Sequence, residues 1–249
     1  MDIKMARAIA KQYGVNVNKR PFLLSKPLDN PKVAKNLKQG YLTAPLHLIP
    51  SDLSGFNVCQ HASEGCRKAC LHTAGNPAYF KGKNKARKAK TRFFFLAREA
   101  FLTLLIEDMR WLASKAESMG YKAGVRLNAT SDLPWERIKL NGIDMISHAR
   151  QCNILPYDYA KSLTRALKQP YHLTLSRTED NDSDCIKALQ SGINVAAVFK
   201  TLPDTWNGFP VIDGDKTDLR PFDGKGVVVG LKAKGKAKTD STNFVIQYH

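Results

Sequence analysis

The sequence predicts an α/β fold in which parallel strands alternate with helices and form an open or partial β/α barrel. Three observations predict it. From residue 122 onward, short apolar stretches alternate with stretches of helical periodicity, which is typical of parallel sheets. Hydrophobic residues make up 43% of the chain, enough for a sizeable core. Polar residues of both charge signs follow most of the apolar stretches, as at the carboxyl ends of parallel strands.

Residues 1–58 are expected to be an extended N-terminal segment that packs on the body, because prolines punctuate it repeatedly. Within it, residues 6–13 predict a short basic helix and residues 40–50 a strand. Residues 59–249 are expected to hold a cysteine-rich loop and the barrel-like part of one single domain.

A long helix ending near Gly120 is predicted by apolar positions that recur at steps of four and three from Phe101 to Met119. Just before it, residues 81–92 are nearly a run of lysines and arginines. This run is either an exposed charged turn or a contact for phosphate or nucleic acid, and the sequence leaves both interpretations open.

The alternating part of the chain predicts six strands, an additional strand near a sheet edge, and three helices. The strands are expected at 123–127, 153–157, 171–175, 193–199, 209–212 and 226–231, the edge strand at 243–248, and the helices from Trp135, at 159–168 and at 184–190.

Five polar residues that follow these strands are candidates for positioning a substrate and moving protons. The alternative is that strand ends are polar simply because they meet solvent. The five candidates are Asn128, Asp132, Arg177, Asp213 and Lys232.

Three of the five cysteines lie within twelve residues, as Cys59, Cys66 and Cys70, with the spacing C-x6-C-x3-C. Thiolates are preferred by soft metals. Three of them predict a [4Fe–4S] cluster with one open iron, since three cysteines are one short of a closed site. A zinc ion completed by His61 or His72 is a second interpretation, and three unrelated buried thiols are a third.

The other two cysteines stand alone. Cys185 falls in a helical stretch and is expected in the core, and Cys152 is the one remaining candidate for a fourth thiolate.

Net charge is +17, which favours a polyanionic partner, either an anionic small molecule or nucleic acid, although a solvated lysine-rich surface remains open. No apolar run approaches the length of a membrane span, and no signal peptide is recognisable. A cytoplasmic, reducing location without disulfides is therefore expected. The chain contains no nucleophile elbow, His-Glu-x-x-His, Walker or dinucleotide-binding motif.

Several segments resemble the phage gene product 88 family of uncharacterised proteins. The similarity extends from about residue 40 to the end and implies a phage-encoded protein of the host bacterial cytoplasm, with no activity to carry over. The segments are Asn57-Val-Cys59, Gly65-Cys66, Ala69-Cys70-Leu, Thr73-Ala-Gly75, Lys90-Thr-Arg92, Arg98-Glu-Ala-Phe101, residues 126–136, Tyr157-Asp-Tyr159, residues 211–215 and residues 229–235.

More distantly, a three-cysteine loop joined to a β/α barrel is similar to radical S-adenosylmethionine enzymes. That resemblance implies S-adenosylmethionine as the ligand of the open iron. The usual spacing there is C-x3-C-x2-C, and this chain also has no Gly-Gly-Glu segment. Two alternative functions are therefore expected. The first is an iron–sulfur enzyme acting on an anionic substrate. The second is a non-enzymatic nucleic-acid-binding protein whose metal only holds the loop together.

Overall fold

The computed structural model describes residues 1–29, 31–73 and 77–247, and it divides the chain into two compact units. Unit 1 comprises residues 1–59 and 78–157, and unit 2 comprises residues 60–77 and 158–249. Gly75 and Tyr248, which belong to the family-like segment and to the predicted edge strand, lie outside the described residues.

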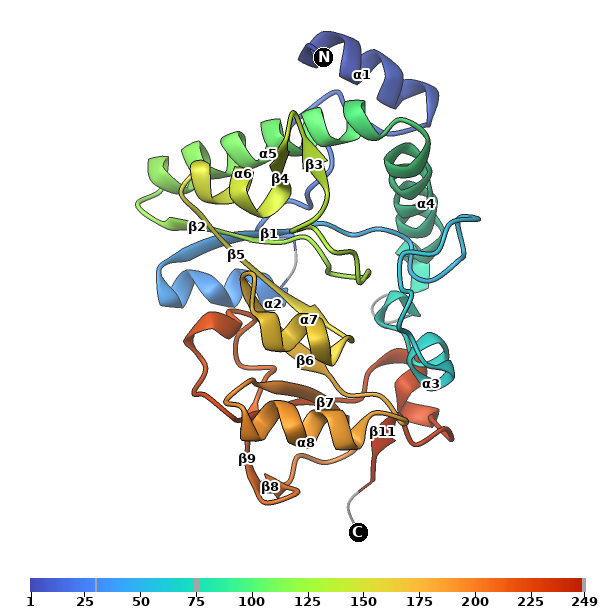
Figure 1. The fold of residues 1–249 in the computed structure, drawn as a ribbon. Coiled ribbons are helices and arrows are strands. Elements are labelled where there is room, and N and C mark those ends of the chain that lie inside the picture. The colour runs from blue at the N-terminus through green and yellow to red at the C-terminus, as the bar shows by residue number, and fades with distance from the viewer. Residues whose placement is uncertain (30, 74–76, 248–249) are drawn as a thin grey trace. The chain divides into compact units, whose positions relative to one another are not determined.

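Unit 1 contains three parallel strands, with β1 paired to β2 and β2 to β5 (Figure 1). The long helix α5 packs against β1 and β2, and α1 packs on α5. The bounds are α1 Ile3–Gln12, α2 Pro31–Ala34, β1 Tyr41–Pro45, α4 Phe80–Leu96, α5 Arg98–Ser118, β2 Lys122–Arg126, β3 Lys139–Leu140, β4 Ile143–Asp144, α6 Met145–Gln151 and β5 Ile154–Ala160, with 3-10 helices η1 at Lys35–Gln39 and η3 at Pro77–Tyr79.

Unit 2 is a parallel sheet with one face covered by α7 and α8. Leu175, Val195 and Val228 of that sheet are fully buried against Ala166 and Ala188 of the two helices. The bounds are α3 Glu64–Lys68, η2 Leu71–Thr73, α7 Leu163–Lys168, β6 His172–Ser176, α8 Asp182–Gln190, β7 Val195–Phe199, β8 Thr205–Trp206, β9 Phe209–Asp213, η4 Arg220–Phe222, β10 Val228–Lys232, η5 Gly235–Thr239 and β11 Val245–Ile246.

The described strands form a mostly parallel nine-stranded sheet, which confirms a mixed α/β fold. The strand order is β1-β2-β5-β6-β7-β10-β9-β8, with β11 paired to β7; β8 is antiparallel to β9, and β3 and β4 form a separate hairpin. This path is open among the described residues. The predicted edge strand near residue 245 is confirmed as β11, although it pairs with the interior strand β7.

Close packing fixes the local register in unit 1. A Cβ atom on Gly124 of β2 would lie 2.6 Å from Cγ2 of Thr43 on β1, so this position accepts only glycine without displacing a neighbour. Thr43 is itself buried and accepts a hydrogen bond of 2.9 Å from the Asn36 side chain.

Two predicted helices differ from the structure. A helix from Trp135 was wrong, because residues 135–137 form a turn and α6 begins at Met145, where Asp144 accepts hydrogen bonds from the Ile146 and Ser147 amides. The helix predicted at 159–168 begins only at Leu163, since β5 continues to Ala160.

The basic run is helical, as α4, but it does not continue directly into the long helix. Ala97, between the two, has the non-helical backbone angles φ −142° and ψ 57°, so α4 and α5 are separate helices.

Candidate functional site

Cys59 of unit 1 lies at the carboxyl end of β2. Its Sγ is 3.9 Å from the carbonyl oxygen of Thr130, which is in the loop that follows β2. The same loop is tied to the residue before Cys59, because the Asp132 amide donates to the Val58 carbonyl at 2.8 Å. Cys59 is 8% exposed, and its own amide donates to the Asn57 side chain.

Asn128 shapes the loop beside Cys59. Its Oδ1 accepts hydrogen bonds from the Ser131 hydroxyl, the Leu133 amide and the Trp135 indole at 2.8, 2.9 and 3.0 Å. Its Nδ2 donates to the Leu133 carbonyl at 2.9 Å. Because this buried amide binds the loop at four points, it positions Asp132, which is 8% exposed. Two of the five candidate residues are thus near Cys59.

Cys66 of unit 2 is in α3, and Cys70 follows directly after Ala69, the C-cap of that helix. Glu179 binds the start of this helix: Oε1 accepts from the Gly65 amide at 2.6 Å, and Oε2 accepts from the Ser63 hydroxyl at 2.7 Å. The Ser63 hydroxyl in turn accepts from the Cys66 amide. Since Glu179 follows β6, this contact holds both cysteines at the carboxyl end of β6.

Gly65 has a packing role at this contact. Its backbone is not in the left-handed region, so this position does not need glycine for its backbone conformation. A Cβ atom at Gly65 would collide with Oγ1 of Thr242, lie 2.7 Å from Oε2 of Glu179 and lie 2.8 Å from Cβ of Phe244. Glycine is therefore the residue that lets α3 approach the segment before β11.

Arg177 lies directly after β6, and its donors are occupied by the chain itself. Its Nε donates to Asp182 at 2.7 Å, and its Nη1 donates to the carbonyls of Asn243 and Phe244, the latter at 3.0 Å. Beside it is a cavity of about 390 Å³, also lined by Trp206. Arg177 is 7% exposed and ties the β11 segment to β6, which makes it a positioning residue.

Asp213 and Lys232 are the last residues of the neighbouring strands β9 and β10. Asp215 connects them: its amide donates to Asp213 Oδ1 at 2.9 Å, and its Oδ2 accepts from the Lys232 amide at 3.2 Å. Asp215 also pairs with Lys234 Nζ at 2.6 Å. Asp215 in this acidic turn therefore accepts hydrogen bonds from the lysine segment.

The residues that sequence reasoning missed are Glu179 and Ser63. Glu179 is one of several polar residues after β6, and nothing in the sequence distinguishes it as the partner of a segment more than a hundred residues earlier. Ser63 did carry a signal, since a serine three residues before Cys66 is a typical helix N-cap.

Cysteines, a residue type that soft metals prefer, are present, but the three candidate ligands are divided between the units. Cys59 belongs to unit 1, whereas Cys66 and Cys70 belong to unit 2. Within the described ranges, no group of three or more His, Cys, Asp or Glu side chains is arranged to hold a metal ion. Of the predicted histidine ligands, His61 is exposed and His72 is partly buried in η2.

The two isolated cysteines lie elsewhere. Cys152 precedes β5, so it is at the amino end of the unit 1 strands, opposite Cys59. Burial raises the pKa of its thiol. Cys185 is fully buried in α8, as expected for a core residue, and burial raises its pKa to about 12.

Comparison with known families gives one match. The sequence model of the family described as gene product 88 matches residues 22–248, which extends the resemblance seen in the sequence toward the N-terminus. Neither the curated proteins nor the solved structures give a match. None of the described helices is long and apolar enough to cross a membrane. Because the match covers nearly the whole chain, the protein belongs to the phage gene product 88 family.

Proposed function

We propose that the protein is an iron–sulfur enzyme in which Cys59, Cys66 and Cys70 hold a [4Fe–4S] cluster with one open iron. The observation that supports the proposal is that, within each unit taken by itself, the cysteines lie at the carboxyl ends of parallel strands. Catalytic groups of parallel α/β folds gather at that end. When bound, such a cluster supplies redox, radical or Lewis-acid chemistry at its open iron.

The remaining candidates receive distinct roles. Asp132 would accept or donate a proton, because its carboxyl lies in the loop that Asn128 holds beside Cys59. Lys232 is exposed at the end of β10 and would attract an anionic substrate, with Asp213 and Asp215 fixing the backbone around it. Arg177 would keep the β11 segment in place.

The proposal is tested by iron and sulfide analysis of protein purified without oxygen. We expect about four iron and four sulfide ions per chain, and an electron paramagnetic resonance signal after reduction. Each of the single substitutions Cys59→Ser, Cys66→Ser and Cys70→Ser should abolish the signal. Cys152→Ser is the matched control and should retain the full iron content, because Cys152 is at the opposite end of the unit 1 strands.

Two results would contradict the enzyme. One zinc ion per chain with no iron would indicate a metal that only holds the loop. Retention of iron in all three serine variants would show that these cysteines are not its ligands.

The fourth ligand and the location are separate parts of the proposal. S-adenosylmethionine added to the reduced cluster should change the electron paramagnetic resonance spectrum if it binds the open iron. An unchanged spectrum would indicate that another ligand occupies that iron. We place the protein in the host bacterial cytoplasm, where reducing conditions keep the three thiols available for metal.

A further inference from the structure

Helix α4 carries a stripe of exposed cations along one side. Lys81, Lys85, Lys88 and Arg92 recur at intervals of four, three and four residues, so they share one face of the helix. All four side chains are exposed. At a rise of 1.5 Å per residue the stripe is about 17 Å long. We call this set the basic stripe.

The orientation of the basic stripe is fixed by the opposite side of α4, which is packed in unit 1. Phe93 and Phe94 are buried, and the Phe94 ring lies 5.5 Å from that of Trp135. The Thr91 hydroxyl accepts a hydrogen bond of 2.9 Å from the Ile49 amide, and Lys90 Nζ donates to the Leu23 carbonyl at 2.8 Å. The stripe therefore points away from the packed face.

Among the residues that the structure describes, no carboxylate pairs with the basic stripe. The sequence has no Asp or Glu between Glu64 and Glu99, while residues 81–92 contain seven of the 39 lysines and arginines. No carboxylate of the described residues forms a salt bridge with the four stripe residues. Three other helices do pair their charges, as Glu64 with Lys68, Glu107 with Arg110, and Asp184 with Lys187.

This arrangement opposes helix stability. Like charges three and four residues apart repel each other on a helix surface. The first turn of α4 has no acidic residue and contains Lys81 and Lys83, although the positive end of the helix dipole favours anions there. Tyr79 before it gives no side-chain cap. A solvated surface helix gains nothing from these features, whereas a helix that binds a polyanion gains affinity from each of them.

We propose that the basic stripe of α4 binds the phosphodiester backbone of nucleic acid. Protein–protein interfaces are depleted in lysine and centred on apolar or aromatic residues, and the stripe has no such centre. Phosphate contacts, in contrast, need point charges at regular spacing, which lysine supplies. The proposal stands on unit 1 alone and does not rest on the iron–sulfur function.

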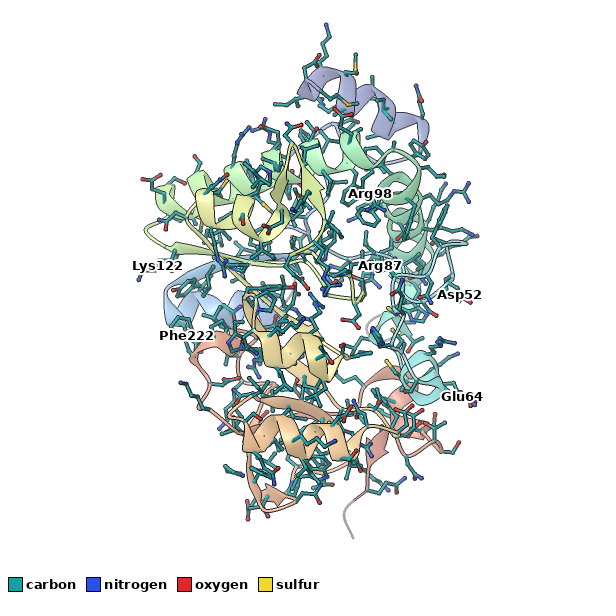
Figure 2. All side chains as sticks on the ribbon, viewed as in Figure 1. Asp52, Glu64, Arg87, Arg98, Lys122 and Phe222 are labelled. Atoms are coloured by element: carbon teal, nitrogen blue, oxygen red, sulfur yellow. The ribbon has the colours of Figure 1, made fainter. Side chains whose placement is uncertain are left out.

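The test is equilibrium binding of the whole protein to a fluorescently labelled oligonucleotide, single-stranded and as the duplex, between about 50 and 200 mM salt. The stripe variant changes Lys81, Lys85 and Lys88 to Gln, which preserves helix propensity. The matched control changes the exposed residues Lys115, Lys122 and Lys139 to Gln and removes the same charge from the same unit. Lys122 lies far across unit 1 from Arg87 of α4 (Figure 2).

We expect the stripe variant to bind roughly 100-fold more weakly at about 0.1 M salt, since each lost phosphate contact lowers the log–log salt slope by about 0.7 to 0.9. The control should stay within a few-fold of the wild type. Circular dichroism of both variants should show unchanged helix content. Replacing the same three lysines by Arg should preserve binding, which separates loss of charge from loss of fold.

Three outcomes overturn the proposal: no binding by the wild type at low salt, equal weakening in the stripe variant and the control, or equal displacement of the oligonucleotide by polyglutamate of the same charge. The last would assign the stripe to acidic proteins. The iron content of the stripe variant is measured separately, so either proposal can fail while the other stands.

Discussion

Two carboxylates bind backbone amides in similar ways, but in different surroundings. Asp108 on α5 accepts three backbone hydrogen bonds, from Phe22, Leu23 and Leu24, at 2.7, 2.6 and 2.9 Å. Glu179 after β6 accepts one from Gly65 and one from the Ser63 hydroxyl.

Burial separates the roles of the two carboxylates. Asp108 is fully buried in unit 1, whereas Glu179 is half-buried at the strand ends of unit 2. The first contact anchors an extended segment to the core, and the second positions the loop that carries Cys66 and Cys70. The same chemistry should therefore contribute to global stability in one unit and to site geometry in the other.

The largest effect is expected from Asp108→Ala. The variant leaves three buried amides without acceptors, and each unsatisfied group costs about 1–3 kcal/mol, so the free energy of unfolding should fall by at least about 3 kcal/mol. Urea denaturation would measure it. Asp52→Ala, at an exposed position labelled in Figure 2, is the control and should change stability by less than about 0.5 kcal/mol. If Asp108→Ala and Asp52→Ala were equally stable, the Asp108 contact would not contribute to global stability, and the contrast with Glu179 would fail.

The pH dependence of stability sharpens the same contrast. Burial raises the pKa of Asp108 from 3.8 to about 6, against the lowering influence of its three amide donors and Lys90. The folded state therefore holds this proton more tightly than the unfolded state. The contribution of protonated Asp108 to the free energy of unfolding should be fully present below about pH 4. It should be lost as the pH rises through about 6. Denaturation of Asp108→Asn over the same range should show a smaller decline, and an identical profile would contradict the assignment.

The smallest effect is expected from Glu179→Gln. The glutamine side chain keeps one acceptor oxygen, so the free energy of unfolding should fall by only about 1 kcal/mol. The readout is local: alkylation of Cys66 and Cys70 should accelerate as α3 loosens, while the buried Cys185 stays protected. Asp204→Asn, at an exposed position in the same unit, should leave all rates unchanged. Unaltered alkylation in Glu179→Gln would indicate that Gly65 packing alone positions the loop.

The parts of the structure that follow from periodicity were predictable. The alternation after residue 122 predicted the strands because a buried parallel sheet needs continuous apolar stretches, which are visible in one sequence. The helix from Trp135 was wrong because the pattern of apolar residues there serves a turn held by Asn128. Propensity could not reveal that hydrogen bond, since it depends on tertiary placement.

The candidate site shows the same division. Local spacing made the three cysteines candidates, and chain position after a strand made Asp132 and Arg177 candidates; their roles stay predictions. The partners of these residues are distant in sequence, as with Arg177 and the carbonyl of Phe244. Whether a polar side chain faces substrate or binds its own backbone is decided by such long-range contacts.

The contact between Ser63 and Glu179 also has a consequence for biosynthesis. The two residues are 116 positions apart. At a translation rate of about 5–20 residues per second, the cysteine segment leaves the ribosome roughly 6 to 23 seconds before its anchor is made. During that interval Cys66 and Cys70 are on a nascent chain that has no docking partner. Delivery of any metal to these two thiols in their final geometry must therefore wait until the second half of the polypeptide has been synthesised.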